Sequence, residues 1–455
     1  MEIYIYSIQK ANTEYTHPMA MNTALLRLLP LLLLLLPPPL RDYLSPPPSD
    51  HGGATEQLRV YHPIILFPGF SCPNLEVRLT DAYTPSLPRC GALKGKGWFP
   101  LWKNPWDLLR HDYVPCFEEQ MTLVFDPALD DYRNLPGVET RVPGFGSAYG
   151  FTSKNDVHNM FCMIRLREEL EVLGYRDKDT LFGAPYDLRH APPPLGQPSQ
   201  VYSDYFARVK DLVQHASGKN GNKPVILIGH SFGGRVILDF LNSTSLSWRQ
   251  NLIKHIIVIS PTPSTGFTQV VTNLASGPDV IGVPTIPSLA LRPMWRAFAS
   301  SLLSLPSPAV FGHKPLIITK NRNYSAYDYP HFLAALGFGT DEVVPFMKRV
   351  LPTMLRIDAP MVPTTYLNGV GIQTMEQVVY WEGNFDIAPE IVHGDGDGCI
   401  NLISVLAFAK ELHRQQQRNN IPFKFIKIDH VTHYDIVSRE HSLRIIMTEL
   451  LEANC

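Results

Sequence analysis

At residues 224–241 the chain reads Pro224-Val-Ile-Leu-Ile-Gly-His-Ser-Phe-Gly-Gly-Arg-Val-Ile-Leu-Asp-Phe-Leu241. The apolar run that begins this stretch predicts a short buried strand, and the residues from Arg235 onward have the period of a helix. Between them lies a G-x-S-x-G sequence centred on Ser231. Glycines allow the strained backbone of a tight strand-to-helix turn, which would hold the serine above the end of a sheet. We therefore expect Ser231 to be a nucleophile; the alternative is an ordinary glycine-rich turn.

The rest of the chain alternates strand and helix patterns. The predicted strands cover 64–67, 256–259, 363–368 and 423–428, and the predicted helices cover about 155–173, 202–215 and 400–416, with a last helix closing the chain. Strands that alternate with helices predict an α/β fold with a mainly parallel sheet. Residues 262–350 are rich in proline, serine and aromatic side chains, and we interpret them as an irregular excursion from the sheet.

A nucleophilic serine needs a base, and the base needs an orienting carboxylate. In a fold with this kind of turn, the acid and then the histidine follow the serine along the chain. The later run His-Gly-Asp-Gly-Asp-Gly offers Asp395 and Asp397, and the loop after the last predicted strand offers His430 and His433. The residues alone therefore predict a triad of Ser231 with one of two aspartates and one of two histidines.

The oxyanion formed during such chemistry requires two preorganised N–H donors. One is expected to be the backbone N–H of Phe232, the residue after the nucleophile. The other is expected from the loop after the first predicted strand, which reads Pro68-Gly69-Phe70. Phe70 N–H is therefore the second candidate, and the alternative for this loop is a plain turn.

Composition excludes several classes of protein. The 455 residues include 40 Lys plus Arg and 42 Asp plus Glu, a net charge of -2, so a strongly basic nucleic-acid binder is excluded and we expect no nucleic-acid partner. The six cysteines are scattered and form no CxxC pair, which argues against zinc-ribbon and thioredoxin-like proteins. An EF-hand starting at Asp395 would need a glutamate at the position of Leu406. We expect neither a metal nor a cofactor.

The N-terminal region has the composition of a targeting signal. Residues 24–36 are an apolar run of leucines with one arginine and one proline, shorter than the ~20 residues of a membrane span and close to the length of a signal-peptide core. We expect an upstream extension at 1–20, a signal peptide or uncleaved signal anchor at 21–40, and a Pro/Ser-rich linker at 41–57. Entry into the secretory pathway (extracellular space, vacuole or ER lumen) would make two sequons available for glycosylation, at Asn323 and at Asn242.

Eight motifs together resemble the lecithin–cholesterol acyltransferase family, most closely its plant lecithin–cholesterol acyltransferase-like members, which are related to lysosomal phospholipase A2. They occur in the family's order across residues of about 60–440. The motifs are Pro63-Ile-Ile-Leu-Phe-Pro-Gly69, Leu75-Glu76, Arg141-Val-Pro-Gly-Phe-Gly146, Ala184-Pro-Tyr-Asp-Leu-Arg189, Gly229-His-Ser-Phe-Gly233, Leu274-Ala-Ser-Gly277, Asn368-Gly-Val-Gly371 and Gly394-Asp-Gly-Asp-Gly398.

The resemblance implies an α/β-hydrolase domain at 58–455, with a lid loop at about 72–116 and a cap insertion at about 262–350. It also implies particular choices where the residues alone left alternatives. The catalytic acid becomes Asp397, the base becomes His433, and the oxyanion donors become Phe70 and Phe232.

The resemblance further implies that a disulfide between Cys90 and Cys116 closes the lid. Trp98, Trp102 and Trp106 fall inside that loop and are expected to contact lipid. The alternative is that these aromatic side chains pack on the core.

The function implied is that of a lipid O-acyltransferase or phospholipase. It would move a fatty acyl group from a glycerophospholipid to a sterol or other lipid hydroxyl, or to water, at a membrane surface. A non-catalytic lipid-binding member of the fold and a general carboxylesterase are the rival functions.

Overall fold

The computed structural model describes residues 61–102, 114–151, 162–262, 265–278 and 288–455. All of them fall in the unit Tyr61–Cys455. The expected upstream extension, signal segment and linker lie outside the described residues.

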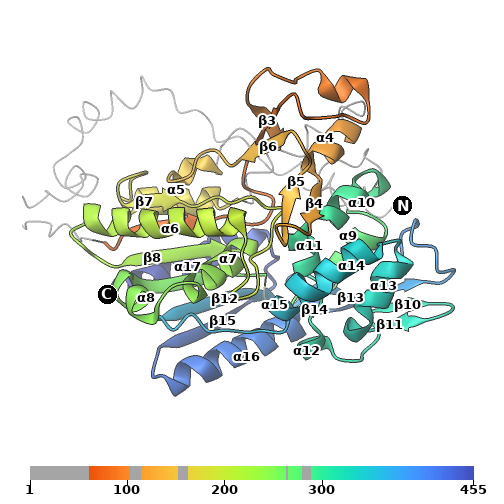
Figure 1. Cartoon of the computed structure of the whole chain (residues 1–455). Helices are drawn as coiled ribbons and strands as arrows, with labels where there is room; N and C mark the ends of the chain where they lie inside the picture. Colours follow the sequence, from red (N-terminus) through yellow and green to blue (C-terminus); the bar gives the residue numbers. More distant parts are fainter. Residues whose placement is uncertain (1–60, 103–113, 152–161, 263–264, 279–287) are drawn as a thin grey trace, which may run out of the picture. The chain divides into compact units, whose positions relative to one another are not determined.

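Six parallel strands form the central sheet, in the order β15-β12-β9-β8-β1-β7 (Figure 1). Their bounds are β1 (Ile64–Phe67), β7 (Leu181–Gly183), β8 (Val225–His230), β9 (Ile253–Ile259), β12 (Thr364–Val370) and β15 (Phe423–Asp429). The predicted strands are confirmed with small changes at their ends, whereas the short strand β7 was not predicted. The central strands read as continuous apolar runs because helices cover both faces of the sheet.

Alternate residues of the strands face two different helical layers. Ile65 and Phe67 of β1 pack in the core that includes side chains of α6, α7 and α16, whereas Ile64 and Leu66 pack with α5 and α17. The helix bounds are α5 (Ile164–Val172), α6 (Gln200–Lys219), α7 (Phe232–Asn242), α8 (Leu246–Leu252), α16 (Leu402–Arg418) and α17 (Glu440–Ala453). A parallel sheet between two helical layers, with Ser231 in the turn between β8 and α7, is the α/β-hydrolase fold.

The excursion between β9 and β12 is mainly helical where it is described, which corrects the prediction of irregular structure. Its helices are α9 (Gln269–Ala275), α10 (Ser288–Ala297), α11 (Ala299–Leu303), α12 (Pro308–Phe311), α13 (Tyr329–Ala335), α14 (Thr340–Pro345), the π-helical turn η6 (Phe346–Val350) and α15 (Leu351–Met354). Prolines lie in the first turns of α12, α13 and α15. Proline is tolerated there because the first N–H groups of a helix have no internal acceptor. Frequent proline therefore begins helices here instead of preventing them.

A second sheet, in the order β11-β10-β13-β14, lies beside these helices (Figure 1). Its strands are β10 (Ile317–Thr319), β11 (Asn323–Tyr324), β13 (Ile372–Tyr380) and β14 (Glu390–Gly396). The long β13–β14 hairpin was not predicted. It matters for the site because β14 leads directly into Asp397.

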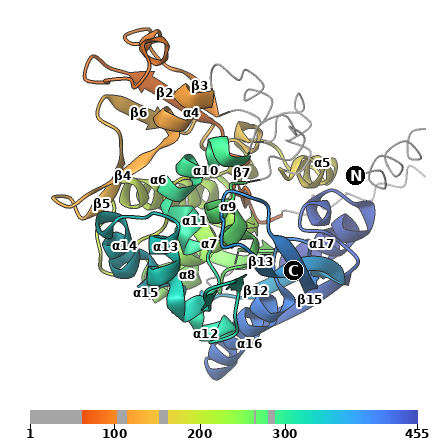
Figure 2. The same cartoon turned by 90° about the vertical axis from the view of Figure 1, so that its right-hand side faces the viewer.

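The segment expected to be a lid loop has regular structure of its own (Figure 2). Its elements and their neighbours are β2 (Leu75–Leu79), β3 (Phe99–Trp102), α4 (Val114–Met121), β4 (Leu123–Asp126), β5 (Asp131–Asn134) and β6 (Val138–Arg141). Strands β3, β2 and β6 form a small antiparallel sheet, and α4 packs against α10 of the excursion. The described residues of this segment, 72–102 and 114–116, are therefore not one loop but belong to a small β subdomain.

Candidate active site

Ser231 occupies the turn between β8 and α7, with φ of 54° and ψ of -127°. This positive φ marks strained backbone in a non-glycine residue, as a nucleophile turn requires. Gly233 makes the turn possible because a Cβ at that position would lie 2.3 Å from the backbone oxygen of Phe67. The N-terminus of α7 lies directly after the serine and provides partial positive charge beside it.

The structure brings three side chains from distant parts of the chain together at this turn. Oγ of Ser231 lies 2.9 Å from Nε2 of His433, and Nδ1 of the same histidine lies 2.9 Å from Oδ2 of Asp397. All three residues are buried. The arrangement gives the serine a base, and it gives that base a carboxylate that fixes its orientation and tautomer.

Asp397 is itself held on both oxygens. Its Oδ1 accepts hydrogen bonds from the backbone N–H groups of Cys399 and Ile400, at 3.0 and 2.7 Å. Its Oδ2 receives a longer contact of 3.5 Å from the side-chain amide of Asn368 in addition to His433. These hydrogen bonds fix the orientation of the Asp397 carboxylate toward the ring of His433, as the orienting acid of such a triad requires.

The two alternative residues lie elsewhere. Asp395 belongs to β14, is exposed on the surface, and accepts a hydrogen bond of 2.8 Å from the backbone N–H of Gly371. His430 is exposed in the turn after β15 and has a positive φ of 54°. A Cβ at Gly371 would lie 3.2 Å from Nδ1 of that histidine. Both residues therefore shape the turn between β12 and β13.

The loop after β1 lies directly beside the nucleophile. A Cβ on Gly69 would lie only 3.1 Å from Nδ1 of His230 and 3.4 Å from Cβ of Ser231, so the absence of a side chain eases this close approach. Tyr186 fixes the loop because its hydroxyl donates to the backbone oxygen of Pro68 at 2.9 Å. The N–H of Phe232 lies at the first position of α7, where helix geometry offers it no acceptor. The chain thus brings the loop after β1 and the first residue of α7 next to one serine.

Aromatic packing links this loop to the excursion, a feature that sequence reasoning missed. The ring of Phe70 stacks on Trp295 of α10, with centroids 5.3 Å apart, and meets the edge of Phe232 at 5.8 Å. Trp295 therefore supports the side of the loop that carries the expected Phe70 donor. No local motif marks this tryptophan, because its partner lies more than two hundred residues earlier in the chain.

Two disulfides brace the region. Cys90 and Cys116 are joined, and a second disulfide joins Cys72 to Cys162. The second pair was not predicted. It anchors the loop after β1 to the start of α5, and Cys72 N–H also donates to the backbone oxygen of Gly69 at 3.2 Å. The cysteines thus form a framework around the candidate site, although they are few.

The residue before the nucleophile is also buried at the site. Nε2 of His230 lies 2.9 Å from the backbone oxygen of His433 and must donate to it, so the proton is on Nε2. Burial, together with the neighbouring His433, lowers the pKa of His230 to about 3. The Nδ1 atom of His230 is buried and has no hydrogen-bond partner among the described residues. His230 is therefore a neutral donor over the physiological pH range.

The three tryptophans of the expected lid lie in different settings. Trp98 is half-buried, and its ring is flanked by the guanidinium groups of Arg78 and Arg141, at 5.0 and 4.4 Å from its centroid. Trp102 ends strand β3. Trp106 lies outside the described residues. The two arginines form ion pairs of their own, with Glu139 and Glu76, so the surroundings of Trp98 are polar as well as aromatic.

The two sequons differ in accessibility. Asn323 is exposed in β11. The side-chain amide of Asn242 is engaged at both ends, since it donates to the backbone oxygen of Asp358 at 3.1 Å and accepts from Arg249 at 2.9 Å. A glycan on Asn242 would have to displace these contacts.

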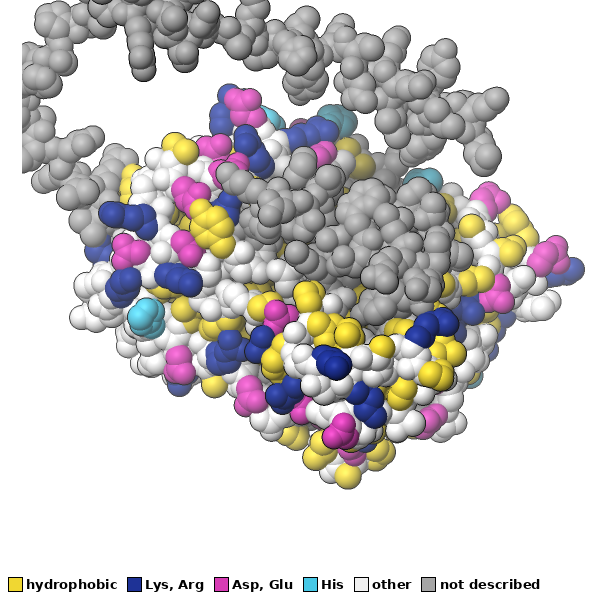
Figure 3. Space-filling model, turned by 90° about the horizontal axis from the view of Figure 1, so that it is seen from above, with side chains coloured by type: hydrophobic (Ala, Val, Ile, Leu, Met, Phe, Trp, Pro, Cys, Tyr) yellow, Lys and Arg dark blue, Asp and Glu magenta, His cyan; other side chains and the backbone are white. Residues whose placement is uncertain are grey.

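The described residues contain no group of three or more His, Cys, Asp or Glu placed to hold a metal ion. None of the helices in the described part of the chain combines the length and hydropathy that a membrane span requires. On the face shown in Figure 3, acidic and basic side chains are interspersed, and neither sign dominates.

Comparison with known proteins gives consistent results. A family model described as lecithin:cholesterol acyltransferase matches residues 98–359. Lecithin-cholesterol acyltransferase-like 1 of Oryza sativa subsp. japonica is 43% identical over 76% of this chain and 77% of its own length. The Arabidopsis thaliana protein of the same description is 38% identical, over 86% and 89%. Lysosomal phospholipase A and acyltransferase of Mus musculus is 29% identical, over 86% and 90%.

Proposed function

The chain belongs to the lecithin:cholesterol acyltransferase family, and from this membership we propose that it moves a fatty acyl group from a glycerophospholipid to a sterol or another lipid hydroxyl, or to water. It is an enzyme of the acyltransferase and phospholipase type. The observation that carries the proposal is the continuous hydrogen-bonded series from Ser231 through His433 to Asp397.

In the first half of the proposed reaction, Oγ of Ser231 attacks the ester carbonyl of the phospholipid, and His433 Nε2 takes the serine proton. Asp397 holds the opposite N–H and stabilises the positive imidazolium. The backbone N–H groups of Phe70 and Phe232 stabilise the oxyanion of the tetrahedral intermediate. The intermediate collapses when His433 returns the proton to the leaving oxygen, which releases a lysophospholipid and leaves the acyl group on Ser231.

In the second half, an acceptor hydroxyl gives its proton to His433 and attacks the acyl-serine carbonyl. The serine then leaves and recovers the proton from the imidazolium. A lipid hydroxyl as acceptor gives a new ester, and water gives a free fatty acid. The name of the mouse relative includes both phospholipase A and acyltransferase, and we propose that the same branch exists in this chain.

The test is to give purified protein phospholipid vesicles with and without sterol and to separate the products by chromatography. We expect release of lysophospholipid in both cases and a sterol ester or another acylated lipid when an acceptor is present. Ser231→Ala should reduce both products by several orders of magnitude, because triad members act as a unit. Ser243→Ala, at the exposed far end of the same helix, is the matched control and should keep full activity.

The rival functions predict different results in the same assay. A general carboxylesterase would hydrolyse a short soluble ester far better than vesicle lipid. A non-catalytic lipid-binding protein would bind vesicles without turnover. Normal turnover by Ser231→Ala would refute the proposed mechanism altogether.

We also propose that the β subdomain around the Cys90–Cys116 disulfide acts as the lid and contacts the lipid surface. Support comes from its position beside α10, whose Trp295 stacks on Phe70. Trp102→Ala should lower activity on vesicles much more than on a short soluble ester, because the triad is untouched. Equal losses on both substrates would mean that Trp102 is a packing residue.

We propose that the protein enters the secretory pathway, with residues 21–40 as signal peptide or signal anchor. Two disulfides fit an oxidising compartment. On this route Asn323 is the expected glycosylation site, because its side chain is exposed, whereas the amide of Asn242 is engaged. Endoglycosidase treatment should lower the mass of the secreted wild type and of Asn242→Gln, because both carry the glycan on Asn323. The same treatment should leave the mass of Asn323→Gln unchanged.

A further inference from the structure

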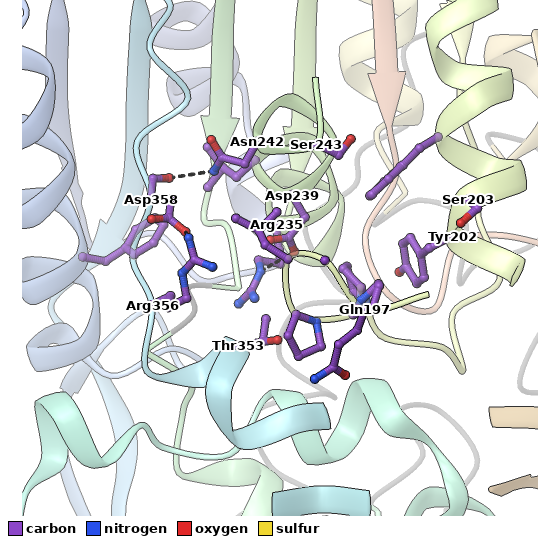
Figure 4. Close-up of a pocket in the computed structure, with 18 residues that line it drawn as sticks. Gln197, Tyr202, Ser203, Arg235, Asp239, Asn242, Ser243, Thr353, Arg356 and Asp358 are labelled. Carbon is purple, nitrogen blue, oxygen red and sulfur yellow. Dashed lines mark hydrogen bonds and ion pairs between the residues drawn. The ribbon is translucent and has the colours of Figure 1, made fainter. Parts of the chain in front are cut away.

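A cavity of about 180 Å³ lies beside α7, among residues that take no part in the proposed chemistry (Figure 4). Its walls come from α6, from α7, from Phe408 of α16, and from residues within 192–197 and 353–358. In Figure 4 the polar groups form a central pair with others on either side: Arg235 with Asp239 in the middle, Arg356 with Asp358 on one side, and Tyr202 with Gln197 on the other.

Arg235 is the unusual residue of this cavity. Its side chain is only 4% exposed, and its Nε donates to Oδ2 of Asp239 at 2.6 Å. Its two Nη nitrogens make no hydrogen bond to any described residue, although Arg235 lines the cavity. These Nη donors are not among the fully enclosed polar atoms of the described residues, so an acceptor that enters the cavity can reach them. An oxyanion is the acceptor that the planar guanidinium fork fits best.

The carboxylate of Asp239 lacks sufficient compensating positive charge, as the guanidinium of Arg235 lacks acceptors. Burial raises the pKa of the Asp239 carboxyl above its ordinary value, even though Arg235 is its ion-pair partner. One guanidinium therefore does not compensate the loss of hydration of this carboxylate. A second positive group in the cavity would favour its ionised form.

The other side of the cavity repeats the same pair of charges. Arg356 and Asp358 form an ion pair of 2.9 Å, with side chains 45% and 42% exposed. The four charged groups that line the cavity therefore sum to zero. A simple anion would meet two carboxylates, and a simple cation would meet two guanidinium groups, so neither matches the whole site.

We propose that this cavity binds a small zwitterion, with a phosphate at the two arginines and an ammonium group at the two aspartates. Arginine forks bind phosphate oxygens in a bidentate manner, and ammonium groups donate to carboxylates. Tyr202, Phe206 and Phe408 also line the cavity, so the ligand would meet aromatic as well as charged side chains. The site is separate from the proposed triad, and the proposal does not depend on the catalytic function.

The probe for the test is phosphoethanolamine, titrated into the full-length protein and followed by calorimetry. We expect saturable binding at least tenfold tighter than that of inorganic phosphate alone or ethanolamine alone. Glycerophosphoethanolamine, titrated in parallel, distinguishes the source of the ligand. Tighter binding of the monoester identifies a free metabolite, and tighter binding of the diester identifies a lipid headgroup.

Two variants connect the binding to the cavity. Arg235→Lys keeps the positive charge but removes the guanidinium fork, and Arg356→Gln changes a partly exposed residue whose loss the fold should tolerate. Each should weaken phosphoethanolamine binding tenfold or more. Arg444→Gln, on an exposed arginine of α17, removes one positive charge as Arg356→Gln does, and it should bind phosphoethanolamine like the wild type. Circular dichroism of each variant shows whether it is folded.

The proposal is overturned if phosphoethanolamine shows no saturable binding to the wild type. It is also overturned if phosphate alone binds as tightly, or if the folded Arg356→Gln variant retains full affinity. The last criterion holds even if Arg235→Lys fails to fold.

Discussion

His230 Nε2 lies 2.9 Å from the backbone oxygen of His433, so the residue before the proposed nucleophile supports the loop that carries the proposed base. The two rings also pack against each other, with centroids 5.2 Å apart. Because one of these histidines must become positive during the proposed reaction, the other has to stay neutral. Burial achieves this by lowering the pKa of His230 to about 3.

This relationship predicts a pH-dependent stability. In the unfolded chain His230 takes up a proton below its ordinary pKa of 6.5, whereas in the folded chain it does so only near 3. The unfolded state therefore binds more protons between these values, and the folded state loses stability as pH falls through that window. Between pH 7.5 and pH 5 the contribution of His230 to this loss is about 2 kcal/mol.

The variant His230→Asn has no histidine that titrates at this position. The difference in free energy of unfolding between the wild type and this variant should therefore shrink by about 2 kcal/mol as the pH falls from 7.5 to 5. Urea unfolding at the two pH values measures the difference. A gap between variant and wild type that does not change with pH would mean that His230 is not held neutral. His441→Asn serves as the control, since His441 lies exposed on α17.

The choice between paired candidates predicts strongly unequal effects. Asp397→Asn should reduce kcat by about 10⁴, because the carboxylate sets the tautomer of His433. Asp395→Asn should stay within about tenfold of the wild type, because that exposed side chain only accepts the Gly371 N–H. The same contrast is expected between His433→Ala and His430→Ala. Single-turnover kinetics on a soluble ester measure the rate of each variant. A larger loss of rate at Asp395 than at Asp397, or at His430 than at His433, would show the assignment to be wrong.

How far the sequence anticipates this site depends on whether each feature is local. Strand β8 and the turn at Ser231 are encoded in consecutive residues, so they could be predicted directly. Asp395 and Asp397 stand two residues apart between glycines, and nothing local separates them. The pairing of β14 with β13 does so, because it places Asp395 on the surface before the chain turns inward at Asp397.

Features that depend on long-range packing could not be predicted in this way. Strand β14 has exposed side chains at nearly every position, so it lacks the apolar alternation that reveals a half-buried strand. The Cys72–Cys162 disulfide spans 90 residues and depends on where α5 begins. The family resemblance selected Asp397, His433 and the Cys90–Cys116 pair, but the stacking of Trp295 on Phe70 is visible only in the three-dimensional structure.

That stacking predicts a role for Trp295 in positioning. If the Phe70 amide stabilises the oxyanion, a looser loop should weaken the transition state more than substrate binding. Trp295→Ala should therefore lower kcat about tenfold to a hundredfold with a small change in KM, on vesicles and on a soluble ester alike. Trp295→Phe should recover part of the loss, because a ring still stacks on Phe70. A change confined to KM would instead assign Trp295 to substrate binding. Trp381→Ala is the control, since that tryptophan is 61% exposed.

The two disulfides predict a graded effect on stability. Closing a loop lowers the entropy of the unfolded chain, and the effect grows slowly with loop length. Cys72–Cys162 spans 90 residues and Cys90–Cys116 spans 26. The expected contributions are about 4 to 5 and about 3 to 4 kcal/mol respectively. Replacing each pair by serines and measuring thermal unfolding should therefore rank Cys72→Ser/Cys162→Ser as the less stable protein.

The effect of each disulfide on activity should depend on where it lies and not on the length of the loop that it closes. Cys72 lies two residues after Phe70 and its N–H bonds to Gly69, so loss of its disulfide should loosen the proposed oxyanion loop. At a temperature where both variants are folded, Cys72→Ser/Cys162→Ser should lose kcat on a soluble ester. Cys90→Ser/Cys116→Ser should lose activity mainly on vesicles, because its disulfide lies in the proposed lid. If both variants lose activity equally on both substrates, the two disulfides serve only global stability.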